Sequence, residues 1–332
     1  MNSPKSFAVL GRGIAGLTAA YHLQKAGLVP TVFGQIEGQA SRAAQGILCN
    51  KGLIFFESPL FKAKLESLQS MQSFLDELEA ESGRAIPRSF GGVAEPYWDA
   101  ADYQTTVARI YRHKFLGCHQ TEDYPGWTAL PESTRLPLGQ LFYPRDGWFD
   151  PLAVLDALEA YLRDRGIVFI AEKVARFFSA AGGEVVLLTN ESSREYSFDR
   201  IIMAAGSGTK ELWEAAGLNA QRMFFIGGQT LSVPRQGAEC PHILAKGSRS
   251  LTLLADQAIL GSSSWKDFES DDLAADAAQL LKETEQNFGL QLTGPYQSRT
   301  GVRFRFKDRM PVVGWVSTGP FAQKLYLLTG FY

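Results

Sequence analysis

A chain of 332 residues is long enough for about two compact domains, and its 45% hydrophobic and 20% charged residues are ordinary for a globular protein. The net charge of −2 argues against a surface devoted to polyanions, although a local basic groove is compatible with it. No apolar stretch reaches the roughly 20 residues of a membrane-spanning helix, and the start, MNSPKSFAVLG, lacks a signal-peptide pattern. We therefore expect a chain without a membrane segment.

The metal-binding and redox-active residue types are sparse. The three cysteines lie far apart without a CxxC pair, which fits reduced thiols in the cytoplasm. The four histidines show no metal-ligand spacing. The sequence thus predicts a cytoplasmic protein with no bound metal.

The first predicted elements form a βαβ unit. Residues 6–10 (SFAVL) are a short apolar run typical of a buried parallel strand. GRGIAG follows, then the apolar-periodic helix LTAAYHLQKAG with Gly27 as its C-cap, then the strand PTVFG. Residues 58–82 predict a longer amphipathic helix.

The middle of the chain begins with a different pattern. Residues 83–140 are rich in glycine, proline and aromatic residues without a sustained period, which predicts loops and short strands. A helix follows at 152–166, with Asp150 as its N-cap and Pro151 at its first position. The strands IVFI, EVVLLTN and FDRIIM come next.

The last third predicts antiparallel strands and one helix. Residues 223–265 alternate like antiparallel strands, and 271–288 are helical. Because βα units occur near the start and in the middle, separated by β-rich stretches, we expect an α/β nucleotide-binding domain interleaved with a mainly antiparallel one.

A glycine loop carries the clearest chemical signal. Gly11, Gly13 and Gly16 form G-x-G-x-x-G between a strand and a helix. The first glycine allows the tight turn, the second the approach of a pyrophosphate, and the third close packing of helix on strand, while the helix N-terminus attracts the phosphates. The loop therefore predicts a dinucleotide site.

The usual ribose-binding acid is missing from this site. An aspartate or glutamate is expected at the end of the second strand. Gly34 occupies that position and Glu37 is the nearest acid, so the ribose must be held by backbone groups, Gln35 or Glu37.

Three later segments carry a resemblance to a known family. SRAAQG (41–46), IIMAAGSG (201–208) and GVRFRFKDRMPVVG (301–314) follow the glycine loop in order. Together they resemble the flavin-binding segments of the D-amino-acid oxidase family, which includes glycine and sarcosine oxidases. Within it, AQGIL (44–48), YPRDGWFDP (143–151) and GVRFRFKDRMPVVGWV (301–316) resemble the FAD-dependent oxidase half of the bifunctional bacterial enzyme that makes methylaminomethyl-thiouridine in tRNA. That enzyme also lacks the acid after the second strand.

The resemblance implies a fold and a cofactor, FAD. The fold class is α/β, with a Rossmann-like FAD-binding domain of the glutathione-reductase type (1–82, 141–220 and 296–332) interleaved with a mainly antiparallel β substrate domain (83–140 and 221–295). It also implies the cofactor-binding residues, which are Gly11, Gly13, Ile14, Ala15, Gly16, Gly34, Gln35, Ser41, Arg42, Ala44, Gln45, Gly46, Val174, Ala204, Ala205, Gly206 and Gly330.

The implied chemistry is hydride removal from the carbon beside a substrate amine, with FAD as acceptor. Arg303 lies where the family's Gly-x-Arg carboxylate binder falls, and arginine can bind both carboxylate oxygens at once. The other interpretation is a surface arginine on an alternating strand, where Arg303, Arg305 and Lys307 share one face. Tyr143 and Trp148 fit core packing better than the substrate cavity.

Three functions stay open. The substrate is an N-substituted glycine, with the carboxymethylaminomethyl group of tRNA as its sharpest version, or a small amino acid such as glycine, sarcosine or a D-amino acid. The third is a flavin-binding remnant without turnover. Family members continue into a helix that closes over the flavin, whereas this sequence stops at LLTGFY, so either the chain is truncated or the flavin site is open.

Overall fold

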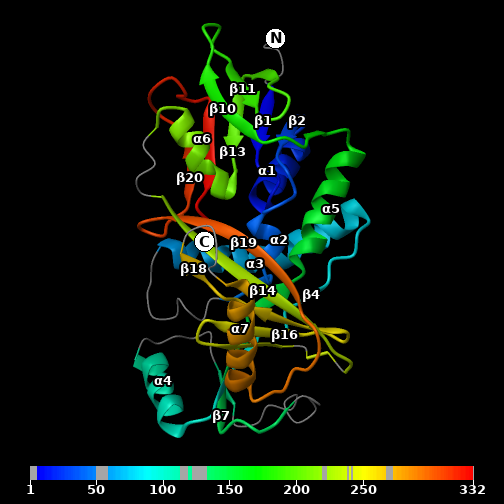
Figure 1. The fold of residues 1–332 in the computed structure, drawn as a ribbon, viewed down its shortest axis with the longest axis vertical. Coiled ribbons are helices and arrows are strands. Elements are labelled where there is room, and N and C mark those ends of the chain that lie inside the picture. Colours follow the sequence, from blue (N-terminus) through cyan, green and yellow to red (C-terminus); the bar gives the residue numbers. More distant parts are fainter. Residues whose placement is uncertain are drawn as a thin grey trace.

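The computed structural model describes residues 6–49, 59–112, 119–121, 133–218, 223–237, 239–240, 242–266 and 272–331. These residues form one half around a mainly parallel sheet and another around an antiparallel sheet, the upper and lower halves of Figure 1. The predicted α/β class, with parallel and antiparallel parts, is confirmed.

The upper half contains a six-stranded sheet in the order β20-β21-β13-β1-β2-β9. β1 pairs in parallel with both β2 and β13, as the predicted βαβ unit requires, and only β20 runs antiparallel to its neighbour. The strand bounds are β1 (Phe7–Leu10), β2 (Pro30–Phe33), β9 (Val168–Ile170), β13 (Arg200–Met203), β20 (Val312–Trp315) and β21 (Leu325–Thr329).

Two different layers cover this sheet. Three helices share a buried core on one face, to which Leu17, Leu75 and Leu158 contribute. A three-stranded antiparallel sheet and a short helix cover the other face, through residues such as Phe177 and Leu212. The helices are α1 (Ile14–Lys25), α3 (Pro59–Ser82), α5 (Pro151–Asp164) and α6 (Thr209–Ala215), and the small sheet is β10 (Val174–Ser179), β11 (Val185–Thr189) and β12 (Glu195–Phe198).

The lower half is built on a nine-stranded sheet, in the order β18-β14-β17-β16-β15-β5-β7-β6 with β19 on the other edge of β14. Its strands are β5 (Val93–Tyr97), β6 (His119–Thr121), β7 (Gly139–Tyr143), β14 (Met223–Pro234), β15 (Ile243–Lys246), β16 (Arg249–Leu253), β17 (Gln257–Gly261), β18 (Trp265–Lys266) and β19 (Gln297–Phe306). Helix α7 (Leu273–Phe288) packs on one face through Leu280 and Phe288, and α4 (Ala100–Arg112) lies on the other through Val107 and Ile110.

Two long strands and several short elements connect the two halves. The long strands, β19 and β14, pair with each other and cross the middle of the molecule (Figure 1). β19 belongs to the segment expected in the FAD-binding domain, and it pairs with a strand expected in the substrate domain; the domain boundaries stay a prediction. The connecting elements are α2 (Ala40–Ala43), β3 (Ile47–Leu48), β4 (Arg88–Ser89), β8 (Gly147–Phe149) and the 3-10 helix η2 (Gly206–Gly208).

Helix starts follow local chemistry. The Asp150 side chain accepts from the amides of Leu152 and Ala153, and Pro151 opens α5, as predicted. Asp272 caps α7 in the same way.

The helix α4 corrects one prediction, since residues 83–140 were expected to contain only loops and short strands. The run 100–112 forms a helix whose buried stripe includes Val107 and Ile110. Asp99 Oδ1 accepts from the amide of Asp102 at its start, at 2.8 Å. The threonines and valine of this run hide its helical period, because β-branched residues favour strands.

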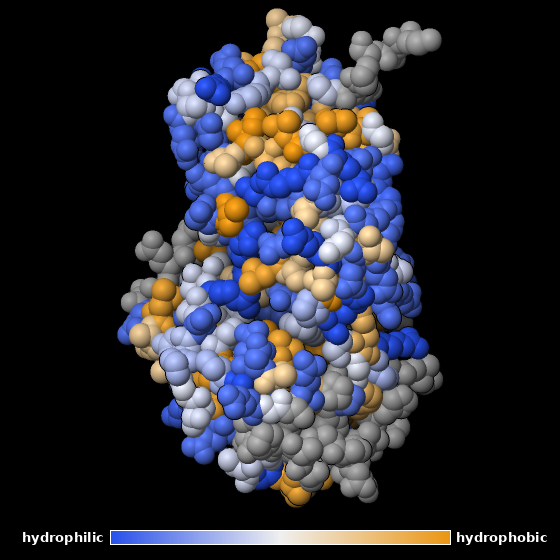
Figure 2. Space-filling model, turned by 90° about the vertical axis from the view of Figure 1, so that its right-hand side faces the viewer, coloured by the Kyte–Doolittle hydropathy of each residue, from blue (hydrophilic) through white to orange (hydrophobic). Residues whose placement is uncertain are grey.

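The side of the molecule shown in Figure 2 is mostly polar, with apolar residues gathered in a band across the upper half. Among the described residues, no helix combines the length and apolar character needed to span a bilayer.

Candidate functional site

A groove of about 720 Å³ runs along the carboxyl ends of β1, β2 and β13. This edge of a parallel sheet is where doubly wound folds bind nucleotides. Most of the predicted cofactor residues lie on its wall, and these are Gly11, Gly13, Ile14, Ala15, Gly34, Gln35, Ser41, Val174, Ala204, Ala205, Gly206 and Gly330.

The glycine loop is shaped by close backbone contacts. Gly11 has φ +121°, and a Cβ atom there would lie 2.1 Å from the carbonyl oxygen of Ala204. A Cβ atom at Gly16 would lie 2.0 Å from the carbonyl oxygen of Gly11. Both positions therefore require glycine, and Gly16 serves helix packing without lining the groove.

The start of α1 is suited to an anion. Unlike α5 and α7, this helix has no cap from the side chain of its N-cap residue, which is Gly13, and its first turn has no acidic residue. The Ile14 amide donates to Ser41 Oγ at 3.0 Å, so α2 is fastened to the same helix end. A glycine N-cap, which lets a ligand approach the backbone, and a positive helix end fit a pyrophosphate.

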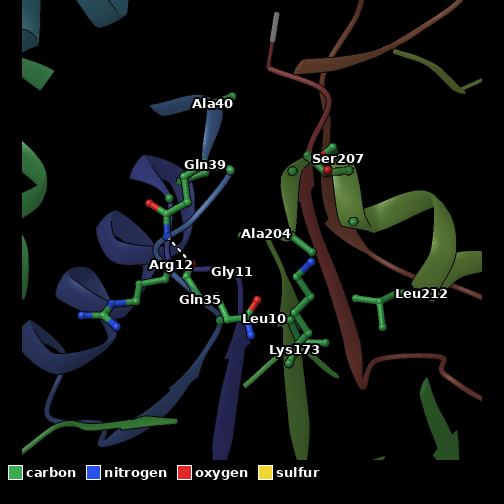
Figure 3. Close-up of a pocket in the computed structure, with 18 of the residues that line it drawn as sticks. Leu10, Gly11, Arg12, Gln35, Gln39, Ala40, Lys173, Ala204, Ser207 and Leu212 are labelled. Atoms are coloured by element: carbon green, nitrogen blue, oxygen red, sulfur yellow. Dashed lines mark hydrogen bonds between the residues drawn. The ribbon is translucent and has the colours of Figure 1, made fainter. Parts of the chain in front are cut away.

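The ribose end of the groove has glycine where an acid is usual. Gly34 has φ +144°, and a Cβ atom there would lie 3.2 Å from the Arg12 amide nitrogen. Gln35 donates to Glu191 Oε1 at 2.5 Å, and Gln39 Nε2 donates to the carbonyl oxygen of Gln35 at 2.6 Å (Figure 3). This end of the groove is therefore lined by carboxamides and by the exposed Glu37.

Arg12, inside the glycine loop, turns its side chain away from the groove (Figure 3). Its Nε and Nη2 donate to the two carboxylate oxygens of Glu159 at 2.8 and 2.5 Å. Arg42 Nη2 lies 3.7 Å from Glu159 and also 3.7 Å from Asp156. This ion-pair group ties the loop and α2 to α5 from behind.

Arg303 lies on the wall of the same groove, on β19. Its partner across the sheet is Ile226, and Gly301 pairs with Gly228. Residues directly opposite in an antiparallel pair point to the same face. That face packs against α2, because a Cβ atom at Gly301 would lie 2.9 Å from the Ala43 Cβ. The groove thus extends from the glycine loop to a guanidinium.

Several predicted residues do not line the groove. Arg42 faces α5, as described above, and Ala44 is exposed beside it. The Gln45 carbonyl accepts from the Trp148 indole at 2.7 Å, and its side chain donates to the Ile259 carbonyl at 2.8 Å. Gly46 accepts from the Phe149 amide at 3.1 Å. These contacts fasten the segment to the lower sheet, and the roles of its residues in cofactor binding stay predictions.

Tyr143 and Trp148 are buried, which agrees with core packing as the better interpretation. The Tyr143 hydroxyl donates to Glu95 Oε2 at 3.1 Å, inside the core beneath α4.

Other residues of the groove were missed by the sequence. Gln39, Lys173, Ser207 and Phe331 lie on its wall. Gln39 lies just before Ser41 in the sequence, and Lys173 directly precedes Val174. This proximity in sequence to predicted cofactor residues was the signal that could have found them. The described residues contain no group of three metal-ligating side chains.

Comparison with known proteins gives a consistent result. Residues 6–332 match the family model described as FAD dependent oxidoreductase. A glycine oxidase of Bacillus licheniformis is 29% identical over 69% of this chain and 61% of its own length. The bifunctional protein of tRNA 5-methylaminomethyl-2-thiouridine biosynthesis from Magnetococcus marinus is 24% identical over 93% of this chain and 47% of its own length. The chain thus spans about half to three fifths of these two relatives.

A solved structure supports the same fold. The glycine oxidase of Geobacillus kaustophilus superposes with a TM-score of 0.83 at 19% identity, covering 99% of this chain and 90% of that one.

Proposed function

The chain belongs to the family of FAD-dependent oxidoreductases, and from this premise we propose that it oxidises the C–N bond of an amino acid or an N-substituted glycine. The observation that carries the proposal is that one groove joins the start of α1, with its glycine N-cap, to Arg303. A dinucleotide bound along the loop would extend toward a guanidinium suited to a carboxylate.

The residues on the groove wall divide into two roles in this proposal. The backbone of Gly11 and Gly13 and the first amides of α1 would hold the pyrophosphate, and Ala205 and Gly330 would flank the cofactor farther along. FAD supplies the hydride acceptor when it is bound. Arg303 would bind the substrate carboxylate with two parallel hydrogen bonds, which orients the carbon beside the amine.

Substrate oxidation then needs little from the protein. The substrate carbon would lose a hydride to the acceptor that bound FAD supplies, the amine nitrogen would lose a proton to water, and water would hydrolyse the resulting imine. An amine that binds in its neutral form needs no protein base. The protein contributes orientation and a fixed positive charge.

Anaerobic bleaching of the flavin tests the proposal. The purified yellow protein should lose its visible absorption with glycine, sarcosine or D-alanine in the absence of oxygen. Arg303→Ala should weaken carboxylate-bearing substrates by about 2–5 kcal/mol. Arg305→Ala is the matched control, because Arg305 shares the strand face but lies over the Phe224 ring, 5.6 Å from its centroid. Equal kinetics of wild type and Arg303→Ala would remove Arg303 from the site.

A second version has the carboxymethylaminomethyl group of tRNA as substrate. The name of the Magnetococcus relative and the basic residues Arg305, Lys307 and Arg309 at the end of β19 favour it. The groove wall itself is mixed in charge, since both Lys173 and Glu37 line it. Bleaching by modified tRNA, falling steeply between about 50 and 200 mM salt, would support this version. No bleaching by tRNA, with bleaching by glycine, would restrict the function to small amines.

A further inference from the structure

A niche lies beside Arg303 on the strand face that packs against α2. Gly228 and Arg303 belong to this face, since Gly228 pairs with Gly301, two residues before Arg303. A Cβ atom at Gly228 would lie 3.8 Å from Arg303 Nη2 and 3.0 Å from the carbonyl oxygen of Ser263. The missing side chain therefore leaves a space bordered by one cation and one hydrogen-bond acceptor.

Ser263 borders this niche in a buried position. It is 7% exposed, and its amide donates to the Gln229 carbonyl at 3.2 Å. Its hydroxyl is buried with no hydrogen-bond partner among the described residues. The hydroxyl thus lies in a buried position without an internal partner, an arrangement that is costly unless a bound molecule completes it.

The two polar borders lie close enough together for one α-amino acid to reach both. Each lies within 3.8 Å of the position that a Cβ atom at Gly228 would take, and the carboxylate and amine of an α-amino acid sit on one carbon, each extending by a hydrogen bond of about 2.8–3.0 Å. A carboxylate can bind the guanidinium while an amine N–H donates to the carbonyl. Gly228 has no positive φ and takes part in a regular strand, so backbone conformation does not require glycine there.

We propose that Gly228 and the Ser263 carbonyl form the amine-binding niche of the substrate site, and that the absence of a side chain at 228 sets the space for the substrate nitrogen. This rests on the proposed function, with Arg303 as the carboxylate binder. The niche selects ligands that carry at least one N–H and only small groups on nitrogen.

Gly228→Ala tests the niche, because the new methyl group fills it without entering the cofactor groove. Without oxygen, glycine binding is taken from the glycine concentration that gives half the maximal rate of flavin bleaching, and the binding of acetate or betaine from its inhibition of that rate. Glycine should bind more than tenfold more weakly to the variant, whereas acetate, which lacks the amine, should weaken less than threefold. Gly182→Ala, at an exposed turn with no atom within 4 Å of the new Cβ, is the matched control.

Equal weakening of glycine and acetate would overturn the proposal, because the methyl group would then disturb only Arg303. Unchanged glycine binding would overturn it as well. A ligand series on the wild type needs no variant: betaine, which has no N–H, should bind at least tenfold more weakly than glycine, and comparable binding contradicts the niche. A wild type that binds FAD but neither glycine nor acetate contradicts the proposed function itself, so the two failures are distinguishable.

Discussion

Breaking the ion pair behind the glycine loop is expected to destabilise the protein strongly. The side chains of Arg12 and Glu159 are only 6% and 12% exposed and share two hydrogen bonds. Removing one partner of a buried pair costs about 3–5 kcal/mol, because the other charge stays buried without compensation. Glu159→Gln should reach this range, since it leaves the guanidinium groups of Arg12 and Arg42 without their shared carboxylate.

Arg12→Met should cost less, because Arg42 remains 3.7 Å from Glu159. The double variant Arg12→Met/Glu159→Met removes both charges and should lie closer to the wild type than the Glu159→Gln variant does. Urea denaturation of the FAD-free proteins measures these free energies of unfolding. Titration with FAD measures whether the glycine loop still binds the cofactor. A Glu159→Gln variant within about 1 kcal/mol of the wild type would refute the reasoning, and so would a double variant at least as unstable as Glu159→Gln.

Three further changes probe the loop, a helix cap and the acid response. Gly11→Ala should weaken FAD binding more than tenfold in a titration. The new Cβ would lie 2.1 Å from the Ala204 carbonyl oxygen, and the φ of +121° disfavours any residue other than glycine. An unchanged FAD affinity would contradict the loop geometry. Asp150→Ala should lower the free energy of unfolding by about 1 kcal/mol through loss of the cap, and no change would contradict that role. A hydrogen bond from Arg88 holds the pKa of Glu79 below its ordinary 4.5. The contribution of this interaction to the free energy of unfolding is therefore complete above pH 4.5 and is lost as the pH falls. Glu79→Gln should flatten the loss of stability below about pH 4.5, and an unchanged acid profile would disprove the contribution.

The parallel half of the fold follows from local signals that agree with one another. The run 6–10 is apolar and bounded by glycine, and its strand is buried throughout. Asp150 and Pro151 mark the start of α5 by capping chemistry, which depends only on neighbouring residues. The groove residues before and within α1 were predictable for the same reason, since the turn demands glycine.

The rest depends on contacts between distant segments. The sequence predicts Arg42 and Gln45 beside the cofactor, and this stays a prediction; the contacts that it could not predict are those of Arg42 with the acids of α5 and of Gln45 with Trp148 and Ile259. Helix α4 was missed because threonine and valine weaken its pattern, although Asp99 three residues before Asp102 was a usable signal. Long-range partners of this kind leave no periodic trace in the sequence.

Titration of the cofactor-free protein with FAD tests the central claim most directly. If the amides at the start of α1 and the glycine loop hold the diphosphate, the protein should become yellow, and a free FAD concentration of 100 times Kd should add about 2.7 kcal/mol to the free energy of unfolding. A correctly folded protein that stays colourless in excess FAD and gains no thermal stability would contradict the account.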